Sequence, residues 1–145
     1  MTLLLLFRFN AMSNKDIKKM VGSLVIILIH VIKIVIEQRT TPSWNGSIYS
    51  RLITIKRYNT SKNNSYVIKQ DEWFEILQDN LETAIDIPSW ECLNGLYKGE
   101  ASTLIADLNI NEVYELSESL LRLSYTKALS KDSVNYTIDK YLNTI

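Results

Sequence analysis

The most hydrophobic part of the chain runs from Val21 to Ile36. Nine of the thirteen residues from Leu24 to Ile36 are Val or Ile, and on propensity alone this composition favours a buried strand. On a helix, however, the polar positions of the segment fall within one arc of roughly 80°, whereas a strand would scatter them over both faces. These positions are Lys19, Ser23, His30, Lys33 and Glu37. We therefore predict a helix over residues 16–38.

This predicted helix has two interpretations. The sixteen residues 21–36 are slightly fewer than the roughly 20 that a bilayer span needs, although Lys33 could snorkel to the interface. His30 and Lys33 are costly in lipid unless they face a partner or water. The sequence leaves two alternatives open: a membrane anchor over residues 20–38 and a buried core helix. The protein is accordingly expected either in the cytoplasm or anchored to a membrane.

Residues 1–15 are predicted to be a flexible extension before this helix. The apolar run from Leu3 to Phe7 is too short to span a bilayer. It has no basic region before it and no small-residue cleavage site after it, so a signal peptide is not expected. Met12 is an alternative start to Met1.

The segment after the helix changes character. Residues 39–49 contain all but the last residue of the stretch "TTPSWNGSIYS". They are rich in turn-forming residues and are predicted to be a linker. The β-branched stretch from Ser50 to Tyr58 and the short "YVIKQ" segment flank a polar loop, which together favour a β-hairpin over Ser50–Gln70.

From Asp71 onward the pattern is helical. The predicted helices are Asp71–Ala84, Ser89–Tyr97, Glu100–Leu108, Asn111–Leu129 and Asp132–Leu142. Asn109 or Asn111 is a candidate N-cap for the fourth helix, and Ser130 or Asp132 for the last. The predicted fold class is α+β and mostly α: a long apolar N-terminal helix, a short β-hairpin, and a cluster of four to five short helices with an acidic surface. Residues 50–145 are predicted to form one small domain.

Charge is distributed very unevenly along the chain. Residues 1–69 carry eleven Lys or Arg and two acids, a net charge of +9. Residues 70–121 carry twelve acids and one base, a net of −11, and residues 122–145 carry four bases and two acids, a net of +2. These three values cancel to the overall zero, so the distribution carries the information.

The segment Asp71–Asp86 contains six acidic and no basic side chains. On a helical wheel its acids occupy an arc of about 100° opposite an apolar face that includes Trp73 and Leu77. One face therefore packs and the other presents carboxylates. Trp90 follows, and tryptophan often anchors protein contacts. The predicted partner-binding residues are Glu72, Glu75, Asp79, Glu82, Asp86 and Trp90.

Like-charge neighbours at these spacings destabilise a helix. Their presence suggests that the negative electrostatic potential has a function, such as attracting a basic partner. One hypothesis is recognition of a basic protein partner, with an immunity- or antitoxin-type inhibitor of a nuclease-type toxin as the specific form. The strongest competing interpretation is internal neutralisation, in which the basic half of the chain folds against the acidic half. The third is a solvated acidic surface. A further alternative function is a single-pass, membrane-anchored accessory protein with a small soluble domain.

The sequence gives little support for a catalytic, metal-binding, phosphate-loop or nucleic-acid-binding site. Cys92 is the only cysteine and His30 the only histidine, and neither has a sequence partner for nucleophilic catalysis. The four glycines form no phosphate-binding loop, and the carboxylates lack the spacing of a calcium loop. The basic stretch around Arg51, Lys56 and Arg57 is more typical of a solvated hairpin than of a nucleic-acid site. We therefore expect no enzyme activity, cofactor, metal or nucleic-acid partner.

Overall fold

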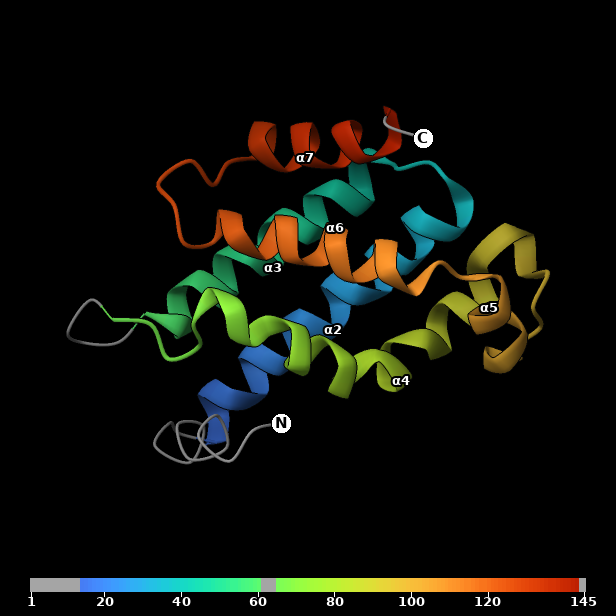
Figure 1. Cartoon of the computed structure of the whole chain (residues 1–145), viewed down its shortest axis with the longest axis horizontal. Coiled ribbons are helices and arrows are strands. Elements are labelled where there is room, and N and C mark those ends of the chain that lie inside the picture. The colour runs from blue at the N-terminus through green and yellow to red at the C-terminus, as the bar shows by residue number, and fades with distance from the viewer. Residues whose placement is uncertain (1–13, 61–64, 144–145) are drawn as a thin grey trace.

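The computed structural model describes residues 14–60 and 65–143, and this part of the chain is helical (Figure 1). The α-helices are α2 (Asn14–Glu37), α3 (Pro42–Asn59), α4 (Trp73–Glu91), α5 (Ala101–Asp107), α6 (Ile110–Leu123) and α7 (Lys131–Asn143). Two short 3₁₀-helices, η1 (Gln70–Glu72) and η2 (Cys92–Gly95), flank α4. No strand occurs among the described residues. Most of the predicted N-terminal extension, residues 1–13, lies outside them.

The predicted N-terminal helix is confirmed as α2, and it is the central helix of the fold. It contacts α3, α4, α6 and η2. Its apolar side chains are buried on several faces, including Leu24, Leu28 and Ile32. The helix ends where Gln38 adopts a positive φ of 53° and donates its backbone N–H to the Ile34 carbonyl at 2.8 Å. Tertiary burial therefore overrides the strand propensity of this Val- and Ile-rich segment.

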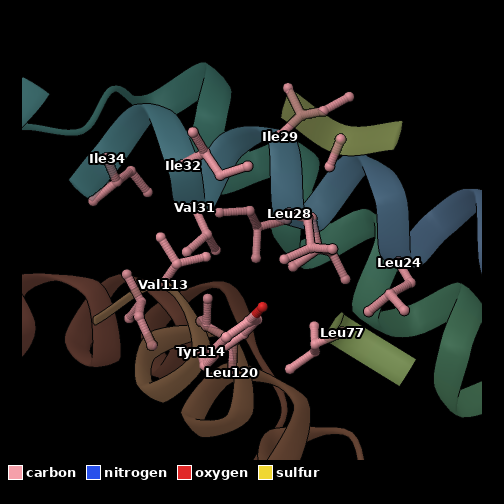
Figure 2. Packing of buried hydrophobic residues seen from close by; sticks show 14 of the residues in the cluster. Leu24, Leu28, Ile29, Val31, Ile32, Ile34, Leu77, Val113, Tyr114 and Leu120 are labelled. Carbon is pink, nitrogen blue, oxygen red and sulfur yellow. The ribbon is translucent and has the colours of Figure 1, made fainter. Parts of the chain in front are cut away.

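The core forms where α2 meets α4 and α6. Figure 2 shows Leu28 and Val31 of α2 near Leu77 of α4 and Leu120 of α6. All four side chains are fully buried. Burial of each such aliphatic side chain contributes about 1.5–3 kcal/mol, so α2 supplies much of the stabilisation of the whole chain.

The predicted α+β class is wrong, because the first strand of the expected hairpin is part of α3. Thr41 caps this helix by accepting the Trp44 backbone N–H at 3.1 Å, and Pro42 follows at its first turn, where proline is tolerated. The residues expected to form a linker and then a strand thus continue as one helix. Its buried positions recur at helical spacing: Ile48, Leu52, Ile55 and Asn59.

The expected second strand is also absent, although the chain does turn back near its predicted position. A single antiparallel bridge joins Thr60 and Tyr66. The buried Asn59 side chain then bonds the backbone of Ile68 twice, as acceptor at 2.7 Å and as donor at 3.0 Å. Tyr125 accepts the Trp73 indole N–H at 2.7 Å and donates to the Ile68 carbonyl. Side chains therefore hold this segment in place of a strand ladder.

The later helices follow the sequence pattern more closely. α4 runs through Pro88 to Glu91, and the second predicted helix, Ser89–Tyr97, is replaced by the end of α4 and by η2. Asn109 caps α6 by accepting the Glu112 N–H at 3.2 Å. α7 packs on the rest of the fold through apolar side chains, with Val134 and Ile138 buried.

Candidate functional site

The predicted binding residues are brought together on one helix. From Glu72, at the end of η1, they follow steps of three or four residues along α4 and therefore lie on one face of it. We call Glu72, Glu75, Asp79, Glu82 and Asp86 the acidic stripe. Trp90 continues the same face one turn after Asp86.

The two ends of the acidic stripe differ. Glu72 is half-buried, and its carboxylate accepts the Lys69 backbone N–H at 2.8 Å, which caps the start of the helical segment. Glu75 and Asp79 also have interactions within the molecule. By contrast, the exposed carboxylates of Glu82 and Asp86 make no hydrogen bond or ion pair within the described residues. The C-terminal half of the stripe is therefore the part available to a partner.

Trp90 is exposed but held in place. Its side chain is 61% exposed, and its ring lies against Gly99 so closely that a Cβ there would be 2.3 Å from the ring atom Cζ2. Gly99 has a φ of +81° and donates its N–H to the Ser89 carbonyl at 2.9 Å. Glycine serves here both for its positive φ and for the close approach of the indole. One ring face is thus supported, which lowers the entropy that a contact through Trp90 would lose.

Three other exposed apolar residues lie within six sequence positions of Trp90. Ile87, Leu93 and Leu96 are 43%, 40% and 62% exposed, respectively. Leu93 and Asn94 both adopt positive φ values, 51° and 56°, in the turn that follows α4. Left-handed backbone at a non-glycine residue such as Leu93 is strained and persists only where its surroundings enforce it. Exposed apolar side chains on such a turn are typical of a contact surface.

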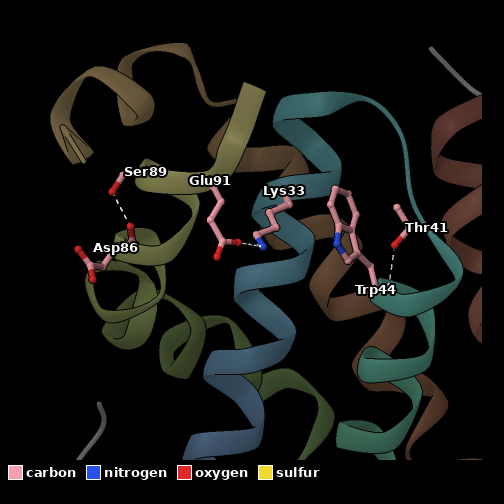
Figure 3. A network of polar contacts seen from close by, with 6 residues as sticks. All are labelled: Lys33, Thr41, Trp44, Asp86, Ser89 and Glu91. Carbon is pink, nitrogen blue, oxygen red and sulfur yellow. Dashed lines mark hydrogen bonds and ion pairs between the residues drawn. The ribbon is translucent and has the colours of Figure 1, made fainter. Parts of the chain in front are cut away.

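An ion pair fixes the end of α4 against α2. Lys33 of α2 donates to the Glu91 carboxylate, and Figure 3 shows the Trp44 ring on the other side of the lysine. The Lys33 ammonium lies 5.8 Å from the centroid of that ring, within the range of a cation–π contact. The Lys33 side chain is 10% exposed and that of Glu91 is 56% exposed. This pair links the basic and acidic halves of the chain directly beside Trp90.

Burial shifts the pKa values of Cys92 and His30, the single cysteine and the single histidine of the chain. Burial raises the pKa of the Cys92 thiol to about 11, with the Glu37 charge adding to the effect. Burial first and the Lys33 charge second lower the pKa of His30, so its imidazole is neutral at pH 7. The buried Nδ1 of His30 has no hydrogen-bond partner among the described residues. No group of three or more potential metal ligands occurs among those residues either.

Sequence reasoning missed two parts of this surface. The support of Trp90 by Gly99 had a weak signal in the glycines of "NGLYKG", but the contact depends on the path of the turn. The Lys33–Glu91 pair joins residues 58 positions apart and had no local signal. Comparison of the chain with protein-family models, curated proteins and solved structures finds no match, so its function is argued from these residues.

Proposed function

We propose that this protein is a non-enzymatic binding protein that neutralises a basic protein partner through the C-terminal half of the acidic stripe and Trp90. The specific form that fits best is an immunity- or antitoxin-type inhibitor of a basic toxin domain. One observation carries the proposal: exposed carboxylates at Glu82 and Asp86 lead directly to an exposed, supported tryptophan. Carboxylates steer and orient a basic partner, and a rigid aromatic side chain supplies contact area at its centre.

Internal neutralisation explains part of the charge asymmetry. Lys33 and Glu91 pair across the two halves, and Glu72 has a capping role. Neither contact involves Glu82 or Asp86. The excess negative charge at the end of α4 therefore supports recognition of something outside the chain.

The alternative of a membrane-anchored accessory protein rests on α2. Its segment Lys15–Glu37 is long and apolar enough to cross a bilayer, yet 61% of its most apolar window is buried within the fold. Transfer of α2 to lipid would uncover the apolar faces of α3, α4 and α6 that pack on it. This packing favours the core-helix interpretation and, with it, the first proposal.

The test is capture of a partner by the full chain and by three variants. Glu82→Lys with Asp86→Lys reverses the exposed carboxylates, Trp90→Ala removes the indole, and Glu115→Lys with Glu118→Lys is a control with the same charge change on α6. We expect the native chain and the control to retain a basic protein and to inhibit its activity. The α4 double reversal should weaken this binding by about 2 kcal/mol, or about thirtyfold. Retention of the partner by both α4 variants, or an acidic partner, would contradict the proposal.

A further inference from the structure

A second charged feature lies between α2 and α3, and the acidic stripe takes no part in it. It is a pocket of about 440 Å³. The N-terminal half of α2 supplies Lys18, Lys19 and Ser23, and the C-terminal half of α3 supplies Arg51, Arg57 and Tyr58. Side chains 39 residues apart in sequence meet here, since the Lys19 ammonium donates to the Tyr58 hydroxyl at 2.9 Å.

The charge around this pocket is of one sign. Four of its lining side chains are cationic and none is acidic. Lys19 is held by Tyr58, but Lys18, Arg51 and Arg57 make no side-chain hydrogen bond or ion pair with other described residues. Arg51 is only half-exposed as a residue, and no acid pairs with its guanidinium among the described residues. Four cations around one concavity repel one another, and a bound anion would relieve that repulsion.

A buried hydroxyl group lies at the wall of the pocket. Ser23 lines the pocket and is only 1% exposed, yet its Oγ has no hydrogen-bond partner in the described part of the chain. A buried hydroxyl without a partner carries a desolvation cost of about 1–3 kcal/mol. Rotation of the Ser23 side chain toward the pocket would let an acceptor atom of a ligand satisfy it.

We propose that this pocket binds a phosphate ester. Arginine presents donors in the geometry that phosphate oxygens accept, and the two lysines add positive charge. The volume is within the range of small-molecule sites and exceeds what a bare phosphate ion fills. Ile26 and the 43%-exposed Ile53 also line the pocket, so an organic group attached to the phosphate has an apolar wall to contact. The phosphate could belong to a soluble metabolite or to a lipid headgroup.

Gly22 allows the pocket to be filled without disturbing the core. It lines the pocket, and a Cβ added there meets no atom within 4 Å. Gly22→Leu should therefore occlude the site, while replacement of a helix-interior glycine tends to stabilise α2. Gly46→Leu is the matched control, because Gly46 lies in α3 and its Cβ position is equally open.

The experiment uses the full chain and two probes. Phenyl phosphate is titrated by calorimetry at low salt, and sedimentation measures binding to phosphatidylcholine vesicles with and without phosphatidic acid. The variants are Gly22→Leu and Arg51→Gln with Arg57→Gln. The controls are Gly46→Leu and Lys127→Gln with Lys131→Gln, which removes two charges elsewhere. Circular dichroism verifies the fold of each variant.

We expect phenyl phosphate to bind the native chain and both controls, and binding to weaken at least about tenfold in the two pocket variants. Loss of phosphatidic acid binding in the same two variants would identify a lipid headgroup as the source, whereas binding of phenyl phosphate alone would identify a soluble ester. The proposal is overturned if neither probe binds the native chain, or if the pocket variants bind as the controls do. Either result leaves the capture experiment on α4 unaffected, since that experiment reports on other residues.

Discussion

The acidic stripe of α4 and the basic pocket between α2 and α3 present opposite charges in opposite shapes. The carboxylates of Glu82 and Asp86 are exposed along a single helix, which is a convex surface. Lys18, Arg51 and Arg57 instead surround a hollow between two helices. A convex charged ridge suits the extended surface of another protein, whereas a charged hollow suits a small anion.

The difference shows that charge excess alone does not specify a partner. The basic and acidic parts of this chain have net charges of similar magnitude, +9 and −11. What separates them is the neighbouring side chains: Trp90 supported by Gly99 beside the acids, and the buried Ser23 hydroxyl beneath the bases. The first suits a protein contact and the second suits a hydrogen-bonding ligand.

The largest effect is expected from removal of α2, which forms one wall of the basic pocket and the centre of the core. A chain of residues 40–145 loses the buried side chains of α2 and should be unfolded, with aggregation and loss of helical circular dichroism. The membrane-anchor interpretation makes the opposite prediction. A soluble, folded chain of residues 40–145 would show that α2 is dispensable to the domain.

A smaller effect is expected at the ion pair that joins the two regions. Glu91→Ala leaves the buried Lys33 ammonium without its partner and should destabilise the fold by about 1–2 kcal/mol, less than for a fully buried pair because Glu91 is more than half exposed.

Lys33→Met is the matched variant on the other side of this pair. It removes the buried charge, keeps an unbranched apolar side chain of similar length, and leaves only the solvated Glu91, so the stability should change little. Urea unfolding of both variants measures the asymmetry. Equal losses in the two variants would show that the pair itself, and not burial of Lys33, determines the stability.

The sequence was sufficient for α2 because its polar residues share one stripe, and that signal outweighed its β-branched composition. Residues 48–59 carry two conflicting signals, because the β-branched Ile53, Thr54 and Ile55 favour a strand. The helical spacing of Ile48, Leu52 and Ile55 and the Thr41–Pro42 start signal favour a helix, and they prevail in the structure. The burial of Lys33 and Ser23 was not predictable, because it depends on which helices cover α2.

The acidic stripe and the basic pocket also differ in how far the sequence alone predicts them. The helical period places the acidic stripe on one face from sequence alone, and the exposed Glu82 and Asp86 lie on that face. The basic pocket requires residues near 18 and near 57 to meet across an antiparallel pair of helices, which no local pattern encodes. Arg51 and Arg57 were therefore interpreted as solvated residues of a hairpin that does not form.

The smallest effect is expected within the acidic stripe itself. Glu82→Lys converts two like-charge spacings, to Asp79 and to Asp86, into opposite-charge spacings, so the free energy of unfolding should rise by about 0.5 kcal/mol. Glu82→Gln removes the same carboxylate with little change in helix propensity, and should give a smaller gain because it adds no base. Urea unfolding at low and high salt measures both variants. The gain should shrink in high salt, because the Debye length contracts from roughly 30 Å at 0.01 M to roughly 3 Å at 1 M. Internal neutralisation requires the reverse: a loss of stability in Glu82→Lys at low salt that high salt restores. That result would mean that this carboxylate serves the fold, and the proposed recognition surface would be reduced to Asp86 and Trp90.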